Sequence, residues 1–201
     1  MRVTLISLVR HGQTDWNLAK RIQGSSDIPL NGTGRAQAEA TGRALAGGSF
    51  GAIYASPLSR ALDTARIIAG HIGLGEPRPL QAVAERRYGD AEGLTGAEIL
   101  ARWPEGTPVP GRESRDQVVE RALPALLELG ERHDGDHVIV VSHGGVIGSL
   151  VRHVTAHALP GPGEVIPNGS VHRFVYDDGE LTLDRFNLGP EDRDLLTASV
   201  M

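Results

Sequence analysis

The chain has 201 residues, which suits one domain with a sizeable hydrophobic core. Hydrophobic residues make up 40% and charged residues 22%, as in an ordinary soluble globular protein. The formal net charge of −5 argues against nucleic acid or a membrane surface as a partner. The chain has 0 cysteines, which excludes disulfides, zinc–thiolate sites and thiol nucleophiles.

The first apolar segment, residues 5–9, is rich in branched side chains and predicts a buried strand. Arg10 and His11 interrupt it, so it is too short for a signal peptide. No run approaches the length of a membrane span, and we expect a cytoplasmic protein. In an open α/β sheet, ligands bind at the carboxyl ends of strands, which places this charged pair well for chemistry. Taken alone, however, the pair could equally lie in a solvated turn.

The next elements alternate between helix and strand. Asn31 is a suitable N-cap for a helix over about 32–46, which follows a loop. Residues 52–55 predict a second buried strand. A second helix is expected to start at Ser56 and Pro57, with the proline in its first turn, and to end at about His71.

The central part of the chain, residues 76–111, is rich in proline and glycine and predicts a long irregular connection. We expect it to contain a short helix over 97–102 and to form a lid at about 86–112. A helical pattern then covers 113–132, where Pro124 is expected to introduce a bend.

The last third predicts a strand over 137–142, a helix after Gly144, and a hairpin of residues 170–176 and 180–186. Alternating strands and helices indicate an α/β fold. We therefore predict a single domain over 1–201. Its architecture would be a three-layer α/β/α sandwich with a mostly parallel central sheet and a C-terminal antiparallel hairpin.

Four short segments carry the residues with chemical potential. They are Arg10-His11-Gly12-Gln13-Thr14, Ser56-Pro57 with Arg60 and Thr64, Glu85 with Tyr88-Gly89 and Glu92-Gly93, and Ser142-His143-Gly144-Gly145. In this order they resemble the signature of the histidine phosphatase superfamily, which includes the cofactor-dependent phosphoglycerate mutases and many phosphatases. The resemblance covers nearly the whole chain and implies a phosphohistidine intermediate on His11.

Phosphoryl transfer needs cations around the non-bridging oxygens, a nucleophile and an acid for the leaving oxygen. Arg10, Arg60 and His143 are the candidate cations, and the planar guanidinium group suits phosphate oxygens. Gly144 is placed to add a backbone N–H at the start of a helix. Neutral His11 could attack phosphorus through a ring nitrogen lone pair.

The remaining assignments follow from the resemblance. Glu85 matches the proton donor, and burial beside a phosphate would raise its pKa. Asn17, Gln23, Gly24 and Tyr88 are assigned to substrate binding. Exposed glutamate, glutamine and turn-forming asparagine side chains would be the alternative interpretation of these positions.

No metal ion or cofactor is expected, because the predicted cations supply the positive charge. His153 and His157 have the spacing of metal ligands on a helix, but the glutamate of zinc proteases is missing between them. We interpret them as two unrelated surface histidines. The predicted partner is a small phosphorylated metabolite, and a homodimer stays open.

Two activities share this chemistry. The segment Glu85-Arg86-x-Tyr88-Gly89 looks like the mutases, yet the lysine that follows the Gly-Leu pair in mutases is replaced here by Thr95-Gly96. The lid is also shorter than theirs and lacks their adjacent arginine pair, for which Arg102, Arg112 and Arg115 could substitute only in part. We favour a metal-independent phosphomonoesterase. A phosphoglycerate mutase is the alternative, followed by a non-catalytic phosphoester-binding module.

Overall fold

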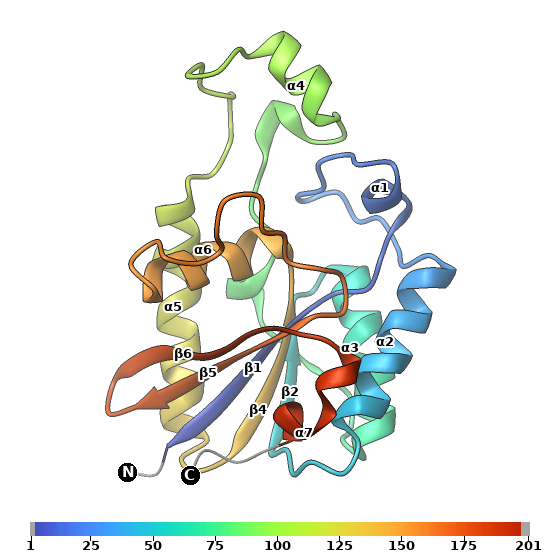
Figure 1. The fold of residues 1–201 in the computed structure, drawn as a ribbon, viewed down its shortest axis with the longest axis vertical. Helices are drawn as coiled ribbons and strands as arrows, with labels where there is room; N and C mark the ends of the chain where they lie inside the picture. Colours follow the sequence, from blue (N-terminus) through green and yellow to red (C-terminus); the bar gives the residue numbers. More distant parts are fainter. Residues whose placement is uncertain (1–2, 198–201) are drawn as a thin grey trace.

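The computed structural model describes residues 3–197, which form a central sheet of six strands between two layers of helices (Figure 1). The strand order is β3-β2-β4-β1-β5-β6. The strands are β1 (Thr4–Arg10), β2 (Ala52–Ala55), β3 (Arg78–Pro79), β4 (His137–Ser142), β5 (Val171–Asp177) and β6 (Glu180–Leu188). The predicted α/β/α sandwich is confirmed.

Parallel pairing joins the first four strands, because β4 pairs in parallel with both β1 and β2, and β2 with β3. The other edge is the predicted antiparallel hairpin, in which β5 pairs with β1 and with β6. Its turn contains Asp178 at φ 43° and Gly179 at φ 86°. Two consecutive positive φ angles match the twist of a tight hairpin, and aspartate followed by glycine tolerates them best.

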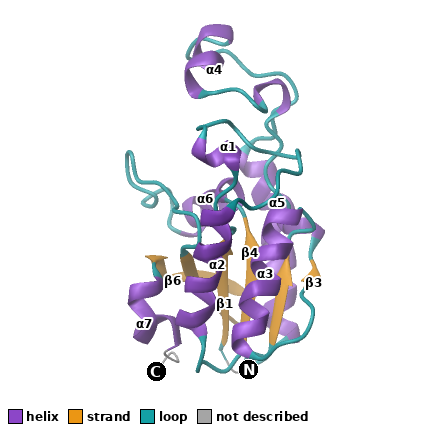
Figure 2. Cartoon of the chain, turned by 90° about the vertical axis from the view of Figure 1, so that its right-hand side faces the viewer, coloured by secondary structure: helices purple, strands orange, loops and turns teal. Residues whose placement is uncertain are grey.

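Helices cover both faces of the sheet (Figures 1 and 2). Those packed on one face are α5 (Arg115–Arg132) and α6 (Gly144–Val154). Those on the other are α2 (Gly32–Leu45), α3 (Ser59–Ile72) and α7 (Arg193–Thr197). Strand β4 shows the division, because Val138 and Val140 belong to the first core while Ile139 and Val141 belong to the second.

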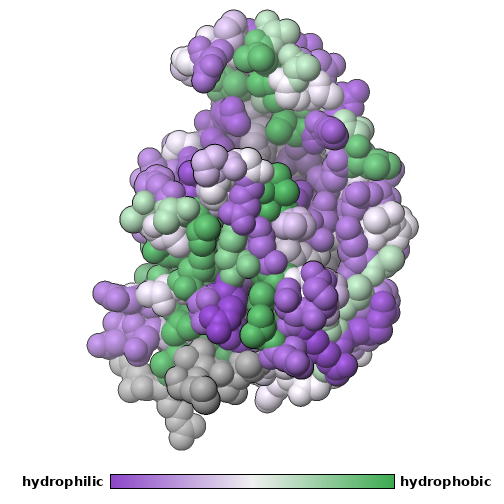
Figure 3. Space-filling model, viewed as in Figure 1, coloured by the Kyte–Doolittle hydropathy of each residue, from purple (hydrophilic) through white to green (hydrophobic). Residues whose placement is uncertain are grey.

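Beyond the carboxyl ends of the parallel strands, the chain builds an outer region that stands away from the sheet (Figures 1 and 2). It contains α1 (Asp15–Leu18) and α4 (Gly96–Arg102), the short helix predicted within the lid. Apolar side chains gather over α4 in the space-filling view (Figure 3), and Leu100 is 60% exposed. The outer region therefore frames the edge of the sheet where a ligand is expected.

Three details differ from the predictions. Helix α3 begins at Ser59 rather than at Ser56, so Pro57 precedes it; extended backbone at Leu58 forms its N-cap. The short helix α1 and the two-residue strand β3 fall in segments predicted as irregular, where so few residues give too little periodicity to recognise. No helix within residues 3–197 is long and apolar enough to cross a membrane.

Candidate active site

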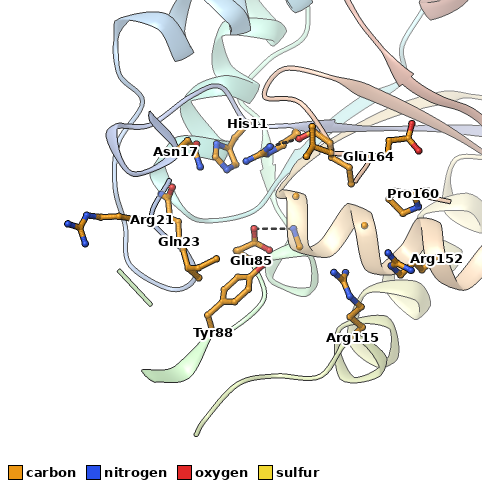
Figure 4. A pocket seen from close by; sticks show the side chains of 17 residues that line it. His11, Asn17, Arg21, Gln23, Glu85, Tyr88, Arg115, Arg152, Pro160 and Glu164 are labelled. Carbon is orange, nitrogen blue, oxygen red and sulfur yellow. Dashed lines mark hydrogen bonds between the residues drawn. The ribbon is translucent and has the colours of Figure 1, made fainter. Parts of the chain in front are cut away.

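The predicted site residues meet at the carboxyl ends of the parallel strands. Arg10 ends β1 and lies opposite Ser142, which ends β4. A cavity of about 300 Å³ opens beside them. Most of the predicted residues line it, namely Arg10, His11, Asn17, Gln23, Glu85, Tyr88 and Gly144 (Figure 4).

His11 is held in one tautomer. Its Nδ1 lies 2.7 Å from the carbonyl oxygen of Gly12, which can only accept, so Nδ1 donates and Nε2 keeps its lone pair. Burial, and then the Arg10 and Arg60 guanidiniums, hold the pKa of His11 well below its usual range. The imidazole is therefore neutral at pH 7, as a nucleophile requires.

The loop after His11 can form only because Gly12 lacks a side chain. A Cβ at this position would lie 2.2 Å from the carbonyl oxygen of Gly34 in α2. The N–H of Gly12 donates to Thr64 Oγ1 in α3 at 3.1 Å. The loop that carries His11 is thus packed directly against both helices on this face of the sheet.

Arg10 and Arg60 bring two guanidiniums to the site. Arg10 Nη1 donates to the Ile166 carbonyl, while its Nε is buried without a partner among the described residues. Arg60 is fully buried and donates to the carbonyl oxygens of Ser26 at 2.9 Å and Gly24 at 2.8 Å. Burial of the two charges lowers the pKa of each arginine.

Gln23 lies between Thr14 and Arg60. When its Nε2 faces Thr14 Oγ1 at 2.7 Å, its Oε1 accepts from Arg60 Nη1 at 3.1 Å. The amide therefore orients the guanidinium as well as lining the cavity.

His143 follows β4 and lies beside His11, with ring centroids 5.0 Å apart. Its Nε2 is 2.7 Å from Ser56 Oγ, and its Nδ1 is buried without a partner in the part of the chain described. Burial, and then Arg60, lower the pKa of His143 well below its usual range. An incoming phosphate would stabilise the protonated ring, since a dianion favours a nearby cation.

Glu85 approaches from the opposite wall, on the segment that follows the short helix Gln81–Val83. Its carboxylate accepts from the N–H of Arg86 at 2.7 Å and of Gly145 at 3.2 Å. Burial raises the pKa of Glu85 in spite of these bonds and of the two nearby arginines. A carboxyl group whose pKa is raised holds its proton to higher pH, which suits general acid catalysis.

The side chains of Tyr88 and Glu85 both lie against Gly145, in the first turn of α6. A Cβ at Gly145 would come within 2.8 Å of the Tyr88 hydroxyl and 2.5 Å of Glu85 Oε1, so this close approach requires glycine. Burial raises the pKa of Tyr88 to about 12, which keeps the hydroxyl protonated. It can therefore donate a hydrogen bond into the cavity.

The last two residues assigned to substrate binding, Asn17 and Gly24, differ in whether they line the cavity. Asn17 lines the cavity, and its Oδ1 accepts from the N–H of Thr14 at 3.1 Å. Gly24 does not line it, because its carbonyl accepts from Arg60 and its N–H donates to Glu92. A substrate contact for Gly24 stays a prediction.

Asn168 is a site residue that the sequence did not indicate. Its Nδ2 donates to the His11 carbonyl at 2.9 Å and to Asn17 Oδ1 at 3.3 Å, which links the backbone of His11 to the cavity wall. It precedes β5, and only the antiparallel pairing of β5 with β1 brings it here. Among residues 3–197, no group of three or more histidine, aspartate or glutamate side chains is placed to hold a metal ion.

Comparison with known proteins agrees with this geometry. Residues 6–189 match the model of the histidine phosphatase superfamily (branch 1). A metal-independent phosphoserine phosphatase of Arabidopsis thaliana is 37% identical over 92% of this chain and 82% of its own length. A 2,3-bisphosphoglycerate-dependent phosphoglycerate mutase of Cytophaga hutchinsonii is 36% identical over 75% and 76%. The solved structure of mycobacterial hydrolase 1 superposes with a TM-score of 0.82 at 31% identity, covering 94% of this chain and 100% of that one.

Proposed function

Because the chain belongs to the histidine phosphatase superfamily, we propose that it hydrolyses small phosphomonoesters, without a metal ion, through a phosphohistidine on His11. The main support is the state of His11 itself. The Gly12 carbonyl fixes the proton on Nδ1, and burial keeps the ring neutral, so Nε2 carries an available lone pair in a cavity.

The surrounding groups suit a phosphate. Arg10 Nε and His143 Nδ1 are buried nitrogens without partners among the described residues, and burial without a partner is costly. A bound phosphate would supply acceptor oxygens for both. The N–H groups at the start of α6, where His143 is the N-cap, would add further donors.

In the proposed first step, Nε2 of His11 attacks phosphorus and the bond to the ester oxygen breaks. Glu85 gives its proton to the departing alkoxide, which leaves as an alcohol. In the second step, water attacks the phosphohistidine while the Glu85 carboxylate takes a proton from it. The nitrogen–phosphorus bond breaks, inorganic phosphate leaves, and His11 is again neutral.

Hydrolysis rather than transfer is favoured by the position of the outer part of the lid, from α4 to Gly111. No residue of α4 or of the segment up to Gly111 lines the cavity in residues 3–197. Water is therefore not shut out by this segment, and an open site suits hydrolysis of the phosphohistidine. Similarity to a phosphoglycerate mutase keeps intramolecular transfer as the second candidate.

One assay separates the candidates. The purified chain is incubated in EDTA with 3-phosphoglycerate or nitrophenyl phosphate, and release of phosphate and formation of 2-phosphoglycerate are followed. The proposal expects phosphate from both substrates in the presence of EDTA. Faster formation of 2-phosphoglycerate than of phosphate would identify a mutase. Binding of phosphate without turnover would identify a binding module, and activity that needs a divalent ion would contradict the mechanism.

A further inference from the structure

The end of the cavity away from His11 carries two arginines of the protein body, Arg115 at the start of α5 and Arg152 on α6. Both line the cavity that holds His11 and Glu85. Figure 4 shows them together at one end, across Glu85 from His11 and Asn17. The cavity therefore has positive charge at both ends.

Neither of these two guanidiniums is neutralised by the protein. Arg152 makes no hydrogen bond or ion pair with any residue in the described part of the chain, and Arg115 makes a single long hydrogen bond of 3.5 Å to Ser149 Oγ. Other arginines nearby are engaged. Arg21 donates to the Gly93 carbonyl at 2.6 Å, and Arg86 donates to the Glu113 carbonyl at 2.6 Å.

The geometry of α6 connects this end to the phosphate site. Gly145, Gly148 and Arg152 line the cavity and are spaced by three and four residues, which places them on one face of the helix. Arg152 follows Gly145 by seven positions, which corresponds to about 10 Å along the helix axis at 1.5 Å per residue. Long helical side chains lean toward the N-terminus of their helix, and Arg152 lines the same cavity as Arg10 and His11.

We propose that Arg115 and Arg152 form a second anion subsite, so that the substrate is a small phosphomonoester that carries a further carboxylate or phosphate group. The subsite rests on the proposed function and deepens it by naming the substrate class. Two guanidiniums that converge on one cavity provide the forked donors that a carboxylate or phosphate accepts in pairs.

Glu164 also lines this end, but its carboxylate is held elsewhere. It accepts from the N–H of Gly161 at 2.9 Å and from Nδ2 of Asn187 in β6 at 3.4 Å. It forms no ion pair with Arg115 or Arg152 among the described residues. The positive charge of the subsite therefore remains available to a ligand.

Matched pairs of substrates test the subsite. 3-Phosphoglycerate differs from glycerol 3-phosphate by a carboxylate in place of a hydroxymethyl group, and fructose 1,6-bisphosphate differs from fructose 6-phosphate by a second phosphate. The kcat/KM of each is measured for the wild type, Arg115→Met, Arg152→Met and the control Arg102→Met. Arg102 ends α4 and does not line the cavity, and its substitution by methionine removes the same charge.

We expect Arg152→Met and Arg115→Met each to lower kcat/KM for the doubly anionic member of at least one pair by about 10–100-fold, as for loss of a charge-assisted hydrogen bond. The kcat/KM of these two variants for the member with a single anionic group should be unchanged. The Arg102→Met control should leave kcat/KM unchanged for every substrate. The pair that responds distinguishes a carboxylate from a phosphate. Parallel losses on both members of each pair, or no loss on either, would overturn the subsite.

A binding measurement makes this test independent of turnover. In the His11→Ala background, which cannot form the phosphohistidine, calorimetry compares the same four compounds. A doubly anionic compound should bind more tightly than its partner, and Arg152→Met should remove that difference. A difference that survives Arg152→Met would contradict the subsite, whereas failure of the wild type to turn over any of the esters would contradict the proposed function alone.

Discussion

The imidazole rings of His11 and His143 lie with their centroids 5.0 Å apart, one after β1 and the other after β4. Parallel pairing causes this proximity, because the register that sets Arg10 beside Ser142 brings the next residue of each strand to the same edge. Burial, and then Arg60 and His11, lower the pKa of His143. One feature of the sheet thus brings together the proposed nucleophile and a second ring that a bound phosphate would stabilise in its protonated form.

The first prediction concerns the nucleophile. His11→Ala should reduce turnover of any phosphomonoester to background, because the proposed intermediate forms on the His11 imidazole. Circular dichroism should show an unchanged fold. Wild-type protein quenched during turnover of a ³²P-labelled ester should carry an acid-labile, alkali-stable label that His11→Ala lacks. His153→Ala removes an exposed histidine as a control, and substantial turnover by His11→Ala would exclude the mechanism.

All strands except β3, and the chemical residues, could be predicted because the signals there are local. Residues 138–141 are an uninterrupted apolar run within β4, and the sequence from Arg10 to Thr14 carries a recognisable motif. Asn31 caps α2 as expected, accepting from the N–H of Gly34 at 2.9 Å. Each of these features depends on side chains close together in the sequence.

Contacts set by tertiary pairing could not be predicted. Asn168 reaches the His11 carbonyl only because β5 pairs with β1. Arg152 is an ordinary surface residue in the sequence, and its place in the cavity depends on how α6 packs on the sheet. The predicted start of α3 was wrong by a few residues, because proline is compatible both with a first helical turn and with the extended segment before a helix.

A second prediction concerns acid stability and His172. This ring is fully buried, its Nδ1 accepts from the N–H of Asn187 at 3.2 Å, and burial, with Arg10, lowers its pKa to about 3. Below pH 6.5 the unfolded chain binds a proton that the folded chain does not, so stability falls as pH falls from about 6.5 toward 3.

Urea unfolding at pH 7 and about pH 4.5 measures this effect. His172 should account for about 3 kcal/mol of the stability lost between them, since each pKa unit corresponds to about 1.4 kcal/mol. His172→Gln should be less stable at pH 7 and lose less on acidification, whereas the exposed His153→Gln should behave like the wild type. An equal loss for His172→Gln and the wild type would show that the ring does not titrate in this way.

A third prediction concerns the support beneath Glu85. Glu113 is 3% exposed and accepts from Arg121 Nε at 2.8 Å and from the N–H of Arg87 at 3.0 Å. Burial alone would raise the pKa of Glu113, but these bonds outweigh it and lower the pKa. Arg121 also donates to the carbonyls of Ala82 at 2.6 Å and Glu85 at 3.4 Å. The ion pair therefore fixes the segment that carries the proposed acid.

Arg121→Met should cost about 3 kcal/mol in urea unfolding, because it leaves the buried Glu113 carboxylate with only the longer ion pair to Arg87 at 3.8 Å. Adding Glu113→Gln should recover part of the loss. Arg132→Met is the control, since its pair with Glu128 is exposed and should be worth less than about 1 kcal/mol. A small effect of Arg121→Met, equal to that of the control, would mean that water replaces the arginine.

The last prediction concerns Glu85 and the leaving group. A general acid matters most for a poor leaving group, because its proton neutralises charge that the departing alkoxide cannot spread. Nitrophenolate leaves readily and needs this proton less. Glu85→Gln keeps the size of the side chain and removes its acidity. We expect kcat/KM for an alkyl phosphate to fall by about 10²–10⁴-fold, with a clearly smaller fall for nitrophenyl phosphate.

The pH dependence provides the control for this comparison. Since burial raises the pKa of Glu85, wild-type kcat/KM for the alkyl ester should decline as pH rises through that pKa, because the acid loses its proton. Glu85→Gln has no proton to lose and should lack this decline. Equal losses on both esters would show that Glu85 positions the phosphate or the Gly145 N–H instead. If neither ester is affected, another group must donate the proton, and Asp90 and Glu92 are the nearest carboxyls in the sequence.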